Sequence, residues 1–133
     1  MGYPPKDNYE GRMYPLDWIS KWLVVLDAAA HAPTHSLDLS KQKPDFVPLS
    51  FYKLFGLPTG AGALVVRREA AAVLHIEYFG GGSVLDATAE GCWRMLMPVP
   101  EGLEAGTMPF LDIISLKYGF DLFKTMGGMQ VRG

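Results

Sequence analysis

Four consecutive apolar residues, Leu23-Val24-Val25-Leu26, limit what this chain can fold into more than any other feature of its sequence. A continuous run of this length, with β-branched residues, is typical of a strand covered on both faces in an α/β sheet. Asp27 ends the run, so its carboxylate is expected at the carboxyl edge of that strand. Ligands bind at this edge in open α/β sheets. The run therefore predicts an α/β fold and makes Asp27 a candidate binding residue.

The other expected elements alternate between strands and helices. They are a helix over 15–22, a strand over 45–50, a strand over 62–66, a helix over 67–76, a glycine turn over 80–82 and a helix over 110–126. Pro48 argues against a central, fully paired strand at its position, and residues 83–104 show no clear period. The pattern predicts a sheet with helical cover, which three strands leave incomplete. The expected division is an extended arm over 1–14, a partial domain over 15–126 and a C-terminal tail over 127–133.

The charge balance and the single cysteine exclude several classes of protein. The 133 residues include 12 Lys and Arg against 14 Asp and Glu, so the chain has no basic surplus with which to bind nucleic acid. One cysteine allows neither an internal disulfide nor a cysteine-rich zinc site. The longest apolar stretch, residues 22–30, is interrupted by Asp27 and is shorter than the ~20 residues that a membrane span needs. With no visible targeting signal, we expect a soluble, cytoplasmic chain.

Two residues are candidates for chemistry, and each also has a plainer interpretation. Asp27 could cap or turn the alanine segment that follows it, or it could place an acid against a cationic ring nitrogen. Lys53 could be an ordinary exposed lysine. Alternatively, the aromatic residues around it in PLSFYKLFG (48–56) could desolvate its ammonium and favour the neutral amine that a Schiff base requires. The segment 60–62 lacks the third glycine of a dinucleotide-binding site and leads into a strand.

The histidines and the cysteine are weaker candidates. His31 and His35 are interpreted as loop residues, because their spacing around a Pro-Thr pair does not suit a helical metal site and no acidic or cysteine cluster completes one. His75 falls in the expected alanine-rich helix, partly exposed. Cys92 is interpreted as an ordinary thiol. Glycines 80–82 could form an anion-binding nest or a flexible turn.

Joined together, these features resemble a known family. An apolar strand, an aspartate and then Ser-x-x-Lys in an aromatic, glycine-rich loop is the layout of pyridoxal-phosphate (PLP) enzymes of the aminotransferase class V, or cysteine desulfurase, type. The particular residues here are most similar to the molybdenum cofactor sulfurase branch of that family. The resemblance implies part of the large, PLP-binding domain of the aspartate aminotransferase-like fold. The segments that carry it are YPLDWI (14–19), LDAAA (26–30), LDLS (37–40), PDFVPLSFYKLFGLPTGAGALVVRR (44–68), YFGGG (78–82) and GTMPFLDIISLKYGFD (106–121).

The resemblance implies a role for each residue that matches a family motif. Lys53 would form the Schiff base with PLP and shuttle protons, and Asp27 would pair with the pyridinium nitrogen, which keeps the ring an electron sink. Ser50 matches the serine that contacts the cofactor phosphate. Tyr52 stands where cysteine desulfurases usually have histidine. Gly106-Thr107 matches a pair that reaches the phosphate of a neighbouring subunit, which implies a homodimer.

The implied reaction takes sulfur from L-cysteine, leaves alanine and passes the sulfur through an enzyme persulfide to the molybdenum cofactor. The chain departs from the family pattern at Ala30, where many cysteine desulfurases have glutamine. The residue that stacks on the PLP ring is expected upstream of this chain, and the persulfide-forming cysteine and the molybdenum cofactor domain beyond its end. Two alternatives stay open: a non-catalytic fragment that holds PLP or dimerises, and another class V aminotransferase or lyase.

Overall fold

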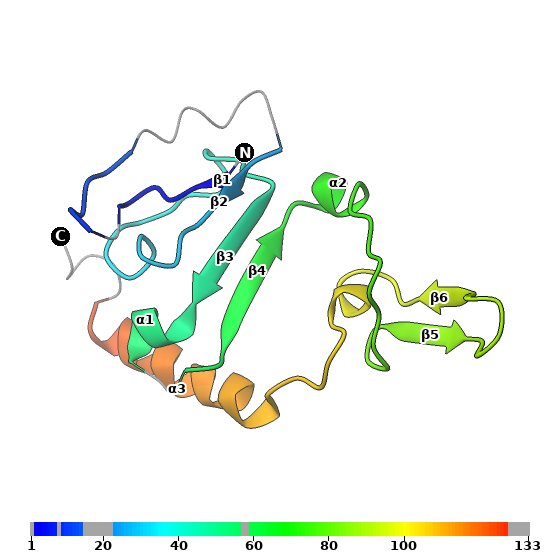
Figure 1. The fold of residues 1–133 in the computed structure, drawn as a ribbon. Helices are drawn as coiled ribbons and strands as arrows, with labels where there is room; N and C mark the ends of the chain where they lie inside the picture. Colours follow the sequence, from blue (N-terminus) through cyan, green and yellow to red (C-terminus); the bar gives the residue numbers. More distant parts are fainter. Residues whose placement is uncertain (1, 8, 15–22, 57–58, 128–133) are drawn as a thin grey trace.

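The computed structural model describes residues 2–7, 9–14, 23–56 and 59–127, so the expected helix over 15–22 lies outside the described residues. The described part is built from short strands and one long helix (Figure 1). In chain order the elements are β1 (Gly2–Tyr3), β2 (Val25–Leu26), β3 (Phe46–Ser50), α1 (Phe51–Phe55), β4 (Gly62–Val66), α2 (Arg68–Ala71), β5 (Val84–Ala87), β6 (Arg94–Leu96), the 3₁₀ helix η1 (Glu101–Leu103) and α3 (Phe110–Thr125).

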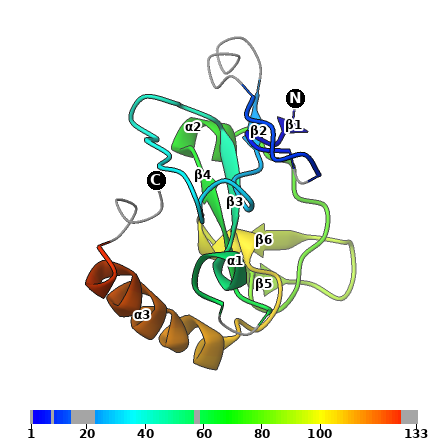
Figure 2. The same ribbon diagram turned by 90° about the vertical axis from the view of Figure 1, so that its left-hand side faces the viewer.

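The main sheet has four strands in the order β1-β2-β3-β4. Strands β1, β2 and β3 are parallel neighbours, whereas β4 returns antiparallel to β3 with Phe46 opposite Val66 and Ser50 opposite Gly62. Strand β1 comes from the expected arm. Helices α1 and α3 lie at the lower end of the sheet in Figure 2. The α/β fold class expected from the sequence is therefore confirmed.

The apolar run before Asp27 is buried on one face, which corrects the expectation of a strand covered on both faces. Val24 and Leu26 are buried, whereas Leu23 is 51% exposed and Val25 is 39% exposed. Successive side chains of a strand point to opposite faces of the sheet. Leu26 forms the core with Ala28 and Val47, and Leu37 and Leu49 pack against it. Among the described residues, Leu23 and Val25 on the other face of the strand belong to no buried cluster.

Pro48 occupies the middle of β3, which is an internal strand of the sheet and not an edge. The Phe51 amide donates to Ala61 on the β4 side, so by alternation the Pro48 nitrogen faces the side of β2. The pairing between β2 and β3 ends at Val25 and Phe46, before Pro48 is reached. The proline is tolerated because no ladder bond is required of it there.

Helices α1 and α3 pack through aromatic rings. The Phe55 ring meets the Phe120 ring edge to face with centroids 4.8 Å apart, and Phe51 lies 6.1 Å from the same ring. The close approach depends on Gly119, where an added Cβ would lie 2.6 Å from the Phe55 ring. The expected C-terminal helix is confirmed, and it ends before Gly127, which has a φ of +83°.

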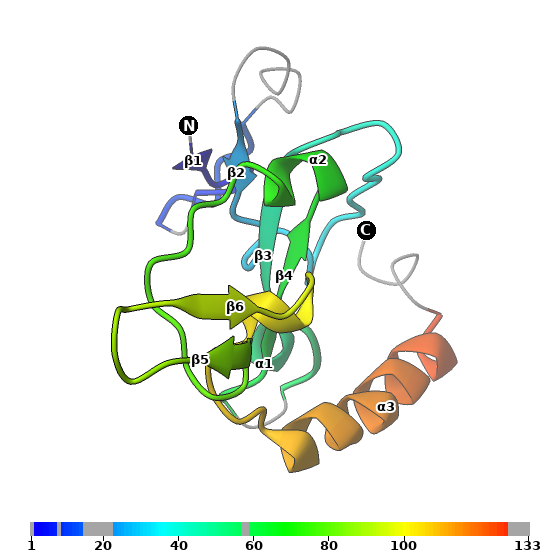
Figure 3. The ribbon, with the colours of Figure 1, turned by 90° about the vertical axis from the view of Figure 1, so that its right-hand side faces the viewer.

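In the middle of the chain, one expected helix is shorter than predicted, and a stretch without a predicted element has regular structure. The helix predicted over 67–76 stops after Ala71, because it buries only Ala70 and so short a helix needs packing to persist. Residues 83–104, which show no sequence period, contain the antiparallel β5–β6 hairpin and η1. This hairpin stands to one side of the main sheet in Figure 1 and in front of it in Figure 3. Within the described ranges, no helix is long and apolar enough to cross a membrane.

Candidate functional site

The parallel strands β2 and β3 bring two of the predicted site residues to one edge of the sheet. Asp27 follows β2 directly, and Ser50 is the last residue of β3. Val25 of β2 lies opposite Phe46 of β3. If this register is continued by two residues along both strands, Asp27 lies level with Pro48. Ser50 then lies about 7 Å further along the strand direction. Both residues therefore lie at the carboxyl edge, where open α/β sheets bind ligands.

Asp27 serves the turn that follows it and still presents an oxygen to solvent. Its Oδ1 accepts a hydrogen bond from the Ala29 amide at 3.0 Å, so the turn-forming interpretation is observed. The residue is exposed, and Oδ2 makes no hydrogen bond with any described residue. One carboxylate oxygen thus holds the backbone while the other is available to a cationic group. The two interpretations of Asp27 are compatible.

Helix α1 places Lys53 at the same edge, since it begins directly after Ser50. The helix ends at Gly56, whose φ of +70° is the left-handed conformation that glycine adopts without strain. Lys53 lies two positions from both Phe51 and Phe55, a rotation of about 200° around a helix. The rings pack on α3 while Lys53 and its neighbour Tyr52 are exposed. Surrounding aromatic residues therefore do not desolvate Lys53 in this structure, which corrects that expectation.

A cavity of about 400 Å³ lies between α1 and the C-terminal half of α3. Tyr52 and Lys53 contribute to its lining from one side, and Gly119 and Phe123 from the other. Lys53 therefore contributes to this cavity, whereas Asp27 and Ser50 do not line it.

Gly106 and Thr107 lie in another part of the molecule. Both are exposed and precede α3, whose contacts with α1 begin near Gly119. Ten helical residues separate the start of α3 from the Phe120 ring that contacts α1, and they span about 15 Å along the helix axis. Gly106 instead lies beside the glycine turn, where a Cβ added to Gly82 would be 3.5 Å from its carbonyl oxygen. The structure does not bring this pair to the edge that carries Lys53.

The backbone of the glycine turn over 80–82 lies against the backbone of residues 104–106. Substitutions at two adjacent glycines of the turn are therefore expected to have different outcomes. An alanine Cβ at position 80 would lie 2.0 Å from the Ala105 carbonyl oxygen, whereas one at position 81 meets nothing within 4 Å. Gly80→Ala is expected to displace residues 104–107 and to destabilise the chain by about 1–3 kcal/mol. Thermal unfolding and amide hydrogen exchange at Gly106 and Thr107 measure both effects.

Gly81→Ala is the matched control, with an expected change within about 0.5 kcal/mol and unchanged exchange at Gly106. Equal destabilisation by the two alanines would show that backbone flexibility, and not the contact with Ala105, is the property that the turn needs.

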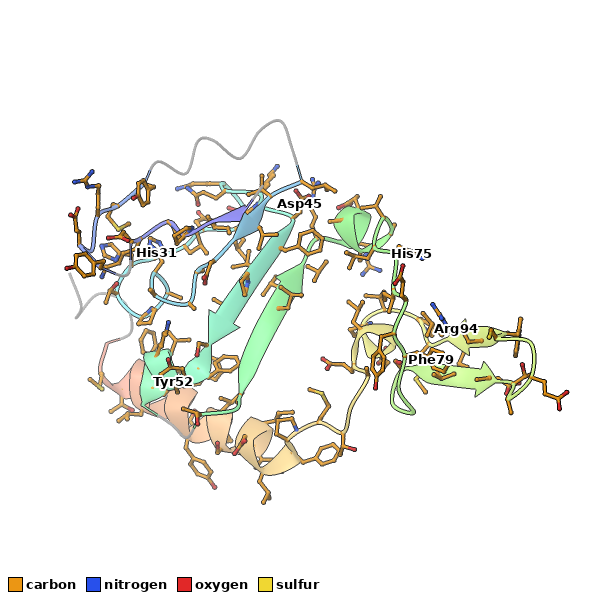
Figure 4. The ribbon with its side chains drawn as sticks, viewed as in Figure 1. His31, Asp45, Tyr52, His75, Phe79 and Arg94 are labelled. Carbon is orange, nitrogen blue, oxygen red and sulfur yellow. The ribbon has the colours of Figure 1, made fainter. Side chains whose placement is uncertain are left out.

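The opposite end of β3 carries a buried ion pair that sequence reasoning missed. Asp45 is 3% exposed, accepts the Val24 amide at 2.7 Å and pairs with the Arg67 guanidinium. Figure 4 shows Asp45 and Tyr52 at opposite ends of this strand. An aspartate at the start of the strand expected over 45–50 and an arginine directly after the strand expected over 62–66 were the signal that could have revealed the pair.

The remaining sequence candidates are placed as follows. His31 is in a loop, as expected, but is only 2% exposed and stacks on His35 with ring centroids 5.2 Å apart. Burial, and next the neighbouring His35, lower the pKa of His31 below its usual 6.5. His75 lies beyond the end of α2 and is exposed, so its placement in a helix was wrong. Cys92 is exposed in the β5–β6 turn. No group of three or more possible metal ligands occurs among the described residues.

Comparison with known proteins relates this chain to a family. The sequence profile of the family described as "Aminotransferase class-V" matches residues 4–132. The human molybdenum cofactor sulfurase is 44% identical to this chain over an alignment 144 residues long, gaps included. The alignment covers 96% of this chain and 16% of that protein. The chain spans 16% to 18% of the length of the curated relatives it matches.

Solved structures agree on the fold. A cysteine desulfurase from Thermococcus onnurineus is 31% identical with a TM-score of 0.69, over 79% of this chain and 26% of that one. A cysteine desulfurase from Escherichia coli has a TM-score of 0.80 at 23% identity, over 92% of this chain and 32% of that one, and shows the fold alone. These likenesses imply PLP as the cofactor of the family. The chain belongs to the aminotransferase class-V family, and its curated relatives are molybdenum cofactor sulfurases.

Proposed function

We propose that this chain is the part of a PLP-dependent sulfur-transfer protein, of the molybdenum cofactor sulfurase type, that supplies the lysine and the aspartate of the cofactor site. One observation carries the proposal: an amine, a hydroxyl and a carboxylate, from Lys53, Ser50 and Asp27, gather at the carboxyl edge of a parallel strand pair. PLP, when bound, supplies an electron sink that allows bonds at the α-carbon of an amino acid to be broken.

The donor groups fit the chemistry of this cofactor. Asp27 has one oxygen available to a protonated ring nitrogen, because only Oδ1 is used by the Ala29 amide. The Ser50 side chain makes no capping hydrogen bond to α1, so its hydroxyl is free to donate to a phosphate. Lys53 is exposed, so its amine is accessible to a carbonyl carbon of the cofactor.

Each residue would then act on the cofactor or on the substrate in a defined way. Lys53 would hold the cofactor through its Nζ and afterwards move a proton at that atom. Asp27 would keep the ring nitrogen protonated, and Ser50 would hold the phosphate. Tyr52, 42% exposed, would lie against the cofactor beside Lys53.

The proposed substrate is L-cysteine, from which an enzyme thiol would take sulfur as a persulfide while alanine leaves, and the acceptor is the molybdenum cofactor. The distant position of Gly106 and Thr107 supports contact with the phosphate of a second copy of the chain, and hence a homodimer. The cysteine desulfurase relatives support the choice of L-cysteine.

A second candidate function is favoured by the exposure of Lys53. Lys53 is open to solvent, and Asp27 does not line the cavity to which Lys53 contributes. The chain could therefore hold PLP or dimerise without catalysing a reaction. Release of alanine and sulfide from L-cysteine supports sulfur transfer, and cofactor binding without release supports the holding function. Turnover of a different amino acid would indicate another class V aminotransferase or lyase.

Reduction with borohydride tests the cofactor assignment directly. The chain is mixed with PLP and reduced, and the labelled peptide is located by mass spectrometry. We expect one label at Lys53, since an amine held beside Asp27 and Ser50 captures the cofactor more often than a free one. The exposed Lys41 and Lys43 are internal controls. A label spread over these lysines in the same proportion as Lys53 would contradict the proposed site.

A further inference from the structure

His31 is a buried imidazole for which the proposed chemistry has no use. It is 2% exposed, and neither Nδ1 nor Nε2 has a hydrogen-bond partner among the described residues. A buried polar group without a partner lowers stability, so its presence calls for an explanation. The ring lies in the turn that follows Asp27, four residues along the chain (Figure 4).

Backbone hydrogen bonds connect His31 to Asp27. The His31 amide donates to the Ala28 carbonyl at 3.1 Å, and the Ala32 amide donates to the same oxygen at 2.8 Å. Ala28 is fully buried in the core, and the next amide, that of Ala29, donates to the Asp27 carboxylate at 3.0 Å. The position of the Asp27 side chain and the burial of the His31 ring are thus set by one turn, residues 28–35.

Two titratable neighbours of His31 oppose a positive charge on it, whereas the Ser36 backbone favours the charge but has a smaller effect than burial and His35. The His35 ring stacks on it at an interplanar angle of 16°. Lys6 comes from the N-terminal arm and donates to the Thr34 hydroxyl at 3.4 Å, and that hydroxyl lies 2.8 Å from His35 Nδ1. Among the described residues, His35 and Lys6 are the titratable groups that act on His31, and both disfavour its protonation.

We propose that His31 is a positioning residue for the cofactor site: its neutral ring, buried under the 28–35 turn, holds Asp27 at the sheet edge, and a proton on His31 opens the turn. The inference deepens the proposed function and rests on it for the consequence at the cofactor. Burial and the neighbouring His35 outweigh the Ser36 backbone, so a protonated imidazole is less stable in the closed turn than in water, and protonation favours its release. Asp27 then loses its fixed position.

The direction of the pH dependence follows from linkage. Burial lowers the pKa of His31 in the closed turn below 6.5, so the open turn binds the proton more tightly. The stability of the closed turn is fully present above about pH 6.5 and is lost as the pH falls through the lowered pKa. Between about pH 6.5 and that lowered pKa, affinity for the cofactor is expected to fall by at most about tenfold per pH unit, as for one linked proton, and to level off below it.

The test follows the Ala29 amide by NMR between pH 8 and pH 5 without cofactor, and the spectral titration with PLP over the same range. His31→Leu keeps the side-chain volume and removes the proton site. We expect it to abolish the acid transition of the Ala29 signal, and to make PLP affinity fall less steeply towards low pH than in the wild type. His75→Leu, which changes an exposed histidine outside the turn, is expected to leave both profiles unchanged.

A second pair of variants keeps the inference testable if His31→Leu does not fold. His35→Leu and Lys6→Met each remove a group that disfavours the charged ring, so both should move the acid transition of Ala29 to higher pH. Unchanged midpoints in these variants, or a wild-type transition that persists in His31→Leu, would overturn the inference. A wild type that fails to bind PLP at pH 8 would instead refute the proposed function, while the Ala29 transition would still decide whether His31 controls the turn.

Discussion

Lys53→Ala is expected to abolish the visible absorption band that the wild-type chain gives with PLP. The band requires a covalent bond between the cofactor and an amine, and Lys53 is the lysine of α1, at the edge that also carries Asp27 and Ser50. Lys53→Arg should abolish the band as well, because a guanidinium keeps the positive charge but is not a nucleophile at neutral pH.

Absorption spectra of the purified variants with added PLP measure this effect. Lys43→Ala is the matched control, since it removes an exposed lysine from the segment before β3 and should leave the band intact. A band of equal strength in Lys53→Ala and in the wild type would mean that PLP reacts with surface amines in general. The chain would then have the family motif without a working site, and the holding function would lose its support too.

Asp45→Ala is expected to cause the largest loss of stability among single substitutions of described polar residues. The Asp45 carboxylate is the acceptor of the Val24 amide and the partner of Arg67. Removing it leaves a buried amide unsatisfied and a cation unpaired. A hydrogen bond to a charged group contributes about 1.5–3 kcal/mol. The Arg67 side chain is 46% exposed, so water compensates part of the lost ion pair and the expected total is about 2–3 kcal/mol.

Thermal or denaturant unfolding measures this loss, with two variants for comparison. Glu69→Ala removes a 75% exposed carboxylate that lies 3.9 Å from Arg67, and should change stability by about 0.5 kcal/mol or less. Asp45→Asn keeps an acceptor for the Val24 amide and should fall between the two. Similar losses from Asp45→Ala and Glu69→Ala would show that the burial of Asp45 contributes little.

The Asp45 substitution also reports on the site, because the bond to Val24 holds β2 in register beside β3. A shift of β2 would move Asp27, which follows it, relative to Ser50 and Lys53. We therefore expect Asp45→Ala to weaken PLP binding at a temperature at which the chain is still folded. The effect would arise at the opposite end of β3 from the cofactor edge.

Two elements were predicted with nearly their observed bounds. The strand over 62–66 is β4 without change, and the helix over 110–126 is α3 to within one residue at its end. Long or strongly apolar segments form the same structure in many surroundings. The helix over 67–76 failed because alanine propensity alone does not sustain a helix that buries only Ala70.

Some features of the candidate site could likewise be predicted from the sequence, and others depend on tertiary contacts. The order of Asp27, Ser50 and Lys53 along the chain, together with the α/β class, is a property of the sequence, since a residue that follows a parallel strand must lie at its carboxyl edge. That Lys53 is exposed could not be read from its aromatic neighbours. Their rings turn towards α3, and that choice depends on Gly119, more than sixty positions away in the chain.

The sequence by itself determined the fold class, the family and the chemical identity of the residues proposed for the cofactor site, because these depend on local pattern and on motifs. Only the tertiary structure decided the burial of His31, the ion pair of Asp45 and the separation of Gly106 from Lys53. Burial and pairing are properties of groups that meet across the chain, and the free energy of a charged or polar side chain depends on which groups it meets.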